Sequence, residues 1–179
     1  MQRAMGGDTA ALAAIVERYY GPILSYLYRL SGGRRQVAED LAQETFLRLM
    51  QQDSYRPDRA FRPWLYAIAT NLARDHVRAA TRDDRASEDA AALLDLADGA
   101  PGPDVLAEAA EAGQAIARAF RQIGEEYRAA LLLRFYHGLS LNEIAEALGI
   151  PLGTVKSRLS VGTRRLRDLL QPIHEGAGQ

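Results

Sequence analysis

Apolar residues recur every three to four positions along most of the chain, which is the spacing of one face of an α-helix. No stretch alternates apolar and polar residues for long enough to predict a β-strand. We therefore predict an all-α protein. A first helix is expected after Asp8, with an apolar face that continues to Leu30 and a break or kink at Gly21-Pro22.

The next predicted helix spans residues 36–51 and separates a broad apolar face from a polar one. The apolar face is formed by Val37, Leu41, Ala42, Thr45, Phe46 and Leu49. Leu47 projects from the opposite face, among acids and an amide. An apolar side chain in that setting is either a contact for a partner or a chance surface leucine, and periodicity does not decide between them.

A further helix is predicted from Pro63, with Trp64 in its apolar stripe. Aromatic and basic residues are interleaved from Tyr55 through Arg82. Such interleaving suits opened DNA, because unpaired bases stack on aromatic rings while cations match the backbone charge. The alternative is that Trp64 and its aromatic neighbours only form a core.

Residues 139–170 predict a helix-turn-helix. Ser140 and Glu143 match the S-x-x-E capping box at the start of its first helix. Gly149 can end that helix in the left-handed conformation, and Pro151 suits the start of the second.

The outward face of the second helix is small, polar and basic. Between Pro151 and Leu170 there are five basic residues and one acid, a local charge of +4 in a chain whose formal net charge is −1. Basic side chains suit phosphates, and small polar residues near the helix N-terminus can reach base edges in a major groove. This pattern favours DNA binding over the alternative, a solvated helix in a bundle.

An acidic segment separates the two halves of the sequence. From residue 83 to residue 113 there are nine acids against one base, Arg85, and Gly99–Pro103 cannot be regular helix throughout. We predict a helical domain at 1–82, an acidic linker at 83–112 that is flexible around Gly99–Pro103, a helix-turn-helix domain at 113–172 and a tail at 173–179. The linker is either a solvated spacer or a competitor of DNA for the basic patches.

Composition excludes several other classes of protein. At 47% hydrophobic and 25% charged residues the chain can bury real cores. It contains no cysteine, and its three histidines are far apart, so no metal site is expected and no cofactor is predicted. No signal peptide, membrane span, nucleotide-binding glycine motif or catalytic constellation stands out. These features predict a cytoplasmic protein that is not an enzyme.

Three motifs, taken in order, resemble the extracytoplasmic-function (ECF) sigma factors, the bacterial class that has only the region-two and region-four domains. The stretch Ala38–Leu49 (AEDLAQETFLRL) is similar to the region-two helix that docks on the β′ clamp helices of RNA polymerase. By that resemblance the polymerase-binding face would be Asp40, Gln43, Glu44, Leu47 and Arg48. Leu47 is then a partner contact.

The stretch Phe61–Arg78 (FRPWLYAIATNLARDHVR) is similar to the part of region two that melts and reads the −10 element, and the loop before it to the part that holds a flipped-out base. The −10 residues implied are Arg56, Arg59, Arg62, Asn71, Arg74 and Arg78.

The stretch Leu131–Leu159 resembles region four, which reads the −35 element and contacts the β flap of the polymerase. The residues expected to contact −35 DNA are Arg134, Thr154, Lys156, Ser157, Arg158, Ser160, Val161, Arg164 and Arg165. Val161 departs from the family, which commonly has arginine there. Valine cannot contact phosphate or guanine but can touch a thymine methyl.

The resemblance implies a dissociable sigma factor that directs core RNA polymerase to promoter DNA, helps to open the −10 region and is held by an anti-sigma factor. Two other hypotheses stay open. One is a helix-turn-helix regulator that acts without polymerase, and the other is a sigma mimic that sequesters an anti-sigma factor.

Overall fold

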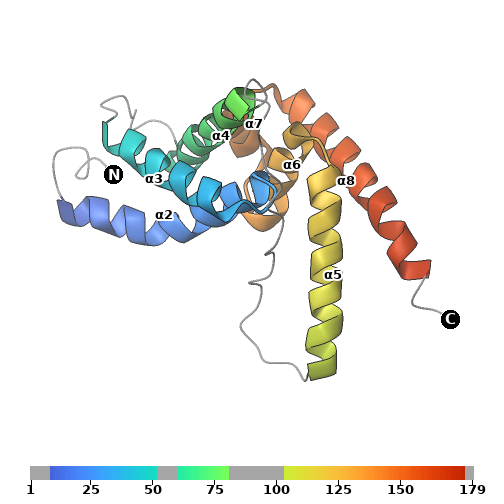
Figure 1. The fold of residues 1–179 in the computed structure, drawn as a ribbon. Coiled ribbons are helices and arrows are strands. Elements are labelled where there is room, and N and C mark those ends of the chain that lie inside the picture. Colours follow the sequence, from blue (N-terminus) through green and yellow to red (C-terminus); the bar gives the residue numbers. More distant parts are fainter. Residues whose placement is uncertain (1–8, 52–59, 81–102, 176–179) are drawn as a thin grey trace.

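The computed structural model describes residues 9–51, 60–80 and 103–175. Every element within these residues is helical, so the predicted all-α class is confirmed. The N-terminal half comprises α2 (Thr9–Leu30), α3 (Arg35–Gln51) and α4 (Phe61–Ala80). The C-terminal half comprises α5 (Pro103–Gln122), α6 (Glu125–Leu131), the π-helix η1 (Leu132–Tyr136), α7 (Leu141–Leu148) and α8 (Leu152–Glu175) (Figure 1).

The N-terminal half is a three-helix unit with an aromatic centre. Tyr26 is fully buried, and its hydroxyl lies 2.8 Å from Thr70 Oγ1. Because Thr70 donates its only hydroxyl proton to the carbonyl of Tyr66 at 2.7 Å, Tyr26 must be the donor to Thr70. Burial raises the pKa of Tyr26, so its hydroxyl stays protonated and this chain of hydrogen bonds is complete.

The buried face of α3 agrees with the sequence pattern. Of the predicted apolar positions only Val37 is not buried; it is partly exposed and packs against the core. The residues buried on this helix are Ala38, Leu41, Ala42, Thr45, Phe46 and Leu49.

The sequence predicted a break or kink at Gly21-Pro22. Helix α2 continues through Pro22, so no break occurs there. A proline inside a helix costs about 3 kcal/mol through its lost hydrogen bond and its clash with the preceding turn. Apolar side chains on both sides of Pro22, from Val16 to Leu27, pack on the same core and hold the two segments in one helix.

The C-terminal half differs from the sequence prediction at both of its ends. Helix α5 begins at Pro103, so residues 103–112 of the predicted linker are helical, whereas the remainder of the linker lies outside the described residues. Alanine is abundant in this segment, and it is the best helix former. Helix α8 continues to Glu175, into the segment 173–179 that was predicted to be a tail.

Helix α8 lies against α6 at a very short distance. A Cβ atom at Gly162 would lie 3.1 Å from Leu131 Cδ1 and 3.2 Å from Tyr127 Cβ. The absence of a side chain at Gly162 therefore permits the close contact between these two helices.

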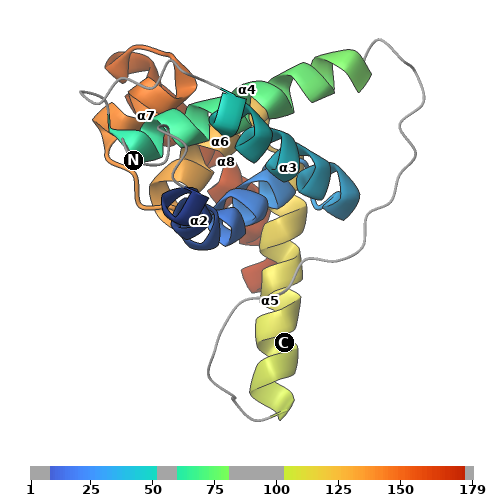
Figure 2. The ribbon, with the colours of Figure 1, turned by 90° about the vertical axis from the view of Figure 1, so that its left-hand side faces the viewer.

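The two halves share one hydrophobic core, in which α4 packs against α7 (Figures 1 and 2). Polar contacts also cross the boundary. Arg74 donates from Nη1 to the carbonyl of Leu148 at 3.3 Å, and Arg128 donates from Nη1 to the carbonyl of Leu30 at 2.9 Å. The structure therefore places the two predicted domains in direct contact.

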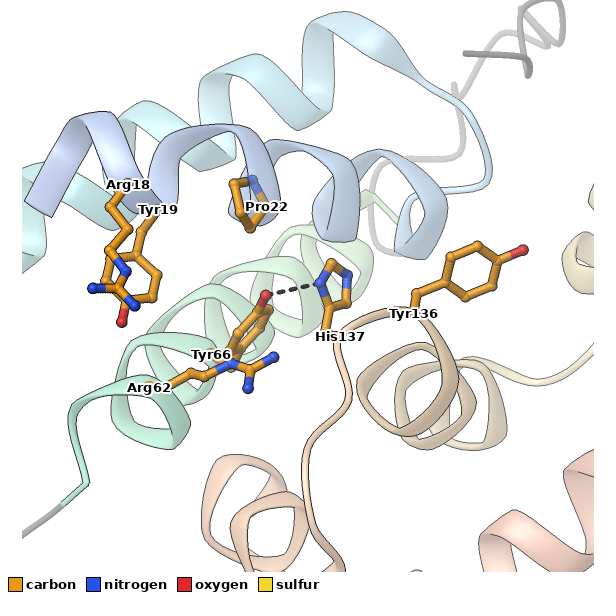
Figure 3. A pocket seen from close by; sticks show the side chains of 7 residues that line it. All are labelled: Arg18, Tyr19, Pro22, Arg62, Tyr66, Tyr136 and His137. Carbon is orange, nitrogen blue, oxygen red and sulfur yellow. Dashed lines mark hydrogen bonds between the residues drawn. The ribbon is translucent and has the colours of Figure 1, made fainter. Parts of the chain in front are cut away.

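His137 lies at the centre of this boundary, immediately after η1. Its Nδ1 is hydrogen-bonded to the Tyr66 hydroxyl at 2.9 Å (Figure 3). Its ring packs edge-on against that of Tyr26, with 5.6 Å between the centroids. Burial, together with the charges of Arg62 and Arg29, lowers the pKa of His137 to about 4. The imidazole is therefore neutral at pH 7.

The lowered pKa of His137 predicts that the fold is destabilised by acid already at pH values above those at which carboxylates titrate. Between the unfolded pKa of about 6.5 and the folded value of about 4, the unfolded chain binds a proton that the folded chain does not. The free energy of unfolding should therefore fall by about 2 kcal/mol between pH 7.5 and pH 5.0. Urea denaturation at the two pH values measures this difference.

The His137→Gln variant, which does not titrate, should lose most of this pH dependence, whereas His76→Gln should retain it. Equal pH dependence in the wild type and the His137→Gln variant would show that His137 does not titrate in this way.

Candidate polymerase and nucleic-acid interfaces

The helix predicted to dock on a partner carries its candidate residues on the solvent side. Asp40, Gln43 and Arg48 are exposed on α3, and Arg48 Nε pairs with Glu44 Oε1 at 2.9 Å, one turn earlier. Leu47 stands among them with 46% of its surface accessible. The structure thus brings the five predicted residues together on one helix face.

Sequence reasoning missed one residue of this face. Met50 lies three positions after Leu47 and is 50% exposed, so the two apolar side chains are neighbours on the same side of α3. The signal was available in the spacing, but Met50 sits at the end of the helix, where periodicity gives little information. Together Leu47 and Met50 form an apolar pair bordered by charged and amide side chains.

The residues predicted to contact −10 DNA differ in their solvent exposure and in their contacts within the protein. Asn71 and Arg78 are exposed on α4, and Arg78 lies 3.7 Å from Asp75. Arg74 is half-buried and is held by its hydrogen bond to Leu148. Arg62 faces the boundary with the C-terminal half, near His137. The two further candidates, Arg56 and Arg59, lie outside the described residues.

The predicted helix-turn-helix forms as its local sequence requires. The Glu143 amide donates to Ser140 Oγ at 3.3 Å, and the Ser140 amide donates to Glu143 Oε2 at 2.8 Å, so the capping box is complete. These hydrogen bonds lower the pKa of Glu143. Gly149 ends α7 with φ of 62°, a left-handed conformation that favours glycine.

Helix α8 presents most of the predicted −35 residues to solvent. Lys156, Ser157, Ser160, Arg164 and Arg165 are exposed, in agreement with the sequence pattern. Arg165 lies over the ring of Tyr127, 4.6 Å from its centroid, and is partly committed to α6. Thr154 and Val161 are half-buried on the flanks of this face.

Two of the candidate arginines are tied to the protein itself, one by burial and the other by a hydrogen bond. Arg158 is half-buried, and its Nη1 is buried without a hydrogen-bond partner among the described residues. Arg134 donates from Nη1 to the carbonyl of Leu139 at 3.0 Å, which ties the end of η1 to the start of α7. Arg164, in contrast, is exposed and available to a ligand.

The structure adds no sign of a metal centre within its described ranges, where no cluster of three or more histidine or carboxylate side chains could hold an ion. Among the same residues, no helix combines the length and apolar composition that crossing a bilayer requires.

Comparison with known proteins matches both halves to one family. Residues 15–83 match the family model for sigma-70 region 2, and residues 113–166 match that for sigma-70 region 4. The chain is 36% identical over 175 residues to the ECF RNA polymerase sigma factor SigW of Bacillus subtilis, with 93% of this chain and 92% of the relative covered. It is 34% identical to the RNA polymerase sigma-H factor of Pseudomonas aeruginosa, with 97% of this chain and 93% of the relative covered.

The fold is also similar to that of a solved sigma factor. The sigma factor RpoE from Bartonella quintana, in complex with the anti-sigma factor NepR, superposes with a TM-score of 0.73 at 24% identity, with 89% of this chain and 96% of that chain covered. The chain belongs to the ECF class of RNA polymerase sigma factors, of the region-two plus region-four type.

Proposed function

We propose that this protein is a dissociable promoter-specificity subunit of bacterial RNA polymerase. The proposal is carried by one combined observation. The chain matches sigma regions 2 and 4, and in the structure the candidate docking face on α3 and the basic face on α8 are both exposed. We assign region two to residues 1–82 and region four to residues 113–172. The protein would act in the cytoplasm, where polymerase is, and would catalyse no reaction itself.

The α3 face would bind the β′ clamp helices of core polymerase. Leu47 and Met50 supply exposed apolar surface, and the surrounding Asp40, Gln43 and Arg48 supply directional polar contacts. An apolar centre with a polar border is the usual anatomy of a protein interface. Region four would contact the β flap.

The α8 face would enter the major groove of the −35 element. Ser157 and Ser160 are small enough to approach base edges, while Lys156 and Arg164 are placed to neutralise phosphates. Val161 replaces the arginine common in the family, so we propose that this position selects a thymine methyl. On α4, Asn71 and Arg78 are exposed to receive the unpaired −10 strand.

In the arrangement seen here the protein cannot bind the −35 and the −10 promoter elements at the same time. The −35 and −10 elements are about 25 base pairs apart, roughly 85 Å at about 3.4 Å per base pair. In the structure the Tyr66 hydroxyl of region two lies 2.9 Å from His137 of the other half. The two halves must therefore separate, and the 22 residues between Ala80 and Pro103 can span up to about 75 Å.

An anti-sigma factor is the partner we propose for the free protein. The Bartonella quintana sigma factor of similar fold is bound to such a factor. A protein that covers the α3 face would compete directly with core polymerase.

Run-off transcription with bacterial core polymerase on a promoter library tests the proposed function. The wild type should initiate from a defined −10/−35 pair. Leu47→Asp should lower initiation at limiting concentration at least tenfold, because a charge would replace a central apolar contact. Arg35→Ala, at the other end of α3 and exposed, is the matched control and should initiate as the wild type does.

Three other outcomes would contradict parts of this proposal. Tight core binding without initiation would favour a sigma mimic that sequesters an anti-sigma factor. Binding of duplex DNA without any core binding would favour an ordinary helix-turn-helix regulator. An unchanged Leu47→Asp variant would remove the α3 face from the polymerase interface.

The salt dependence of −35 binding tests the role of α8. Each phosphate neutralised in duplex DNA contributes about −0.9 to the slope of log K against log salt concentration. Arg164→Ala should make the slope less steep by about that amount, measured by fluorescence anisotropy with a −35 duplex. Arg118→Ala, an exposed arginine on α5, should leave the slope unchanged. The same slope in the Arg164→Ala variant and the wild type would mean that this side chain does not contact phosphate.

Separation of the halves can be measured by energy transfer between two dyes. Because the chain contains no cysteine, Arg35→Cys and Arg167→Cys together give one label on α3 and one on α8. Transfer efficiency should fall when core polymerase and promoter DNA are added. A pair within region two, Arg35→Cys with Ala79→Cys, should not change. Constant efficiency in both pairs would contradict an opening step.

A further inference from the structure

A cavity of about 340 Å³ lies at the boundary between the two halves (Figure 3). Arg18 and Tyr19 of α2 and Arg62 and Tyr66 of α4 form the region-two side, while Tyr136 and His137, at the end of η1, form the region-four side. The cavity therefore exists in this form only while the halves are packed together. None of the sequence motifs predicted it, because its walls come from three separate segments.

The lining of the cavity contains two arginines and no carboxylate. The ion pairs among the described residues involve Arg35, Arg48 and Arg78, so neither Arg18 nor Arg62 has a carboxylate partner there. The positive charge of Arg62 contributes to the lowered pKa values of His137 and Glu143, and its side chain is hydrogen-bonded to Tyr66. Guanidinium groups bind phosphate and carboxylate oxygens strongly, because their donors match the planar arrangement of the acceptors. The charge therefore suits an oxyanion.

The remaining walls are aromatic and held in place. The ring of Tyr19 packs edge-on against Phe61, with 5.2 Å between centroids. Tyr136 lies beneath the guanidinium of Arg29 at 4.5 Å and against Phe120 at 6.2 Å. Fixed rings lose little freedom when a flat ligand binds between or beside them. The cavity is thus prepared for a ligand that carries a ring as well as an anion.

We propose that this cavity binds a small aromatic oxyanion of the mononucleotide class and that the bound ligand favours the packed arrangement of the two halves. The volume is near the lower end of the roughly 300–1,000 Å³ typical of small-molecule pockets, which fits one nucleotide better than two. The phosphate lies between Arg18 and Arg62, and the base packs beside Tyr19 and Tyr136, the two tyrosines of the lining that are not buried. Binding itself does not depend on the proposed sigma function, whereas its effect on polymerase does.

Isothermal titration of the full chain with AMP, with adenosine and with inorganic phosphate tests the proposal. AMP should bind at least tenfold more tightly than either of the other two compounds, because only AMP has both the ring and the anion. Titration of GMP, CMP and UMP shows which base is preferred. Failure of all four mononucleotides to bind at millimolar concentration overturns the proposal.

Variants on the two sides of the cavity distinguish a site shared by both halves from a DNA-binding site that lies on region two alone. Arg62→Ala, Arg18→Ala and Tyr136→Ala should each weaken AMP binding at least tenfold. Tyr136→Phe, which keeps the ring, should bind as the wild type does, and so should the surface control Arg118→Ala. Because Arg18 is exposed, the Arg18→Ala variant tests the anion contact without disturbing the core. Loss of binding in Arg62→Ala and Arg18→Ala but not in Tyr136→Ala would overturn a site shared by both halves.

The effect on polymerase is measured separately. If AMP binds only the packed arrangement and polymerase only the open one, AMP at ten times its dissociation constant should weaken core binding about 11-fold. Unchanged core affinity would overturn the regulatory part while leaving the binding site intact. Failure of core binding in the absence of AMP would instead contradict the proposed function.

Discussion

The contact between α4 and α7 is the constraint on which the rest of this structure depends. Leu65, Ile68 and Leu72 of one helix share a buried core with Ile144 and Leu148 of the other, although nearly half the chain separates them in sequence. Burial of apolar surface is the main favourable term in such packing, and it has no directional requirement. The core therefore joins region two to region four without fixing a permanent geometry.

The hydrogen bonds across this boundary are of a kind that can break when the two halves separate. The Tyr66–His137 hydrogen bond joins neutral partners, because the pKa of Tyr66 is raised to about 12 by burial while that of His137 is lowered. Arg74 and Arg128 donate to backbone carbonyls and not to carboxylates. Among the described residues no buried ion pair crosses the boundary, whereas the breaking of a buried ion pair would leave an uncompensated charge. Arg74 cannot contact Leu148 and a DNA strand with the same donor.

Local chemistry decided which features could be predicted from the sequence. The capping box of Ser140 and Glu143 and the left-handed Gly149 depend on residues within one turn, and both formed as predicted. The buried face of α3 followed from a 3.6-residue period. Periodicity indicates that a face is buried, but it does not identify what covers it. The contact of Tyr66 with His137, 71 residues later, therefore could not be predicted, and neither could the continuity of α2 through Pro22, which depends on packing.

The π-helix explains why the boundary lies where it does. A single-turn π-helix adds a residue to a helix and changes the direction of the side chains that follow, and such turns are frequent at functional sites. Leu131, Leu132 and Leu133 are buried in succession, whereas Phe135 is 66% exposed. This change of register places Tyr136 against Arg29 and His137 against Tyr66. A regular 3.6-residue helix through the same segment would turn these two side chains elsewhere, so the π-turn of region four forms one wall of the cavity and the contact with region two.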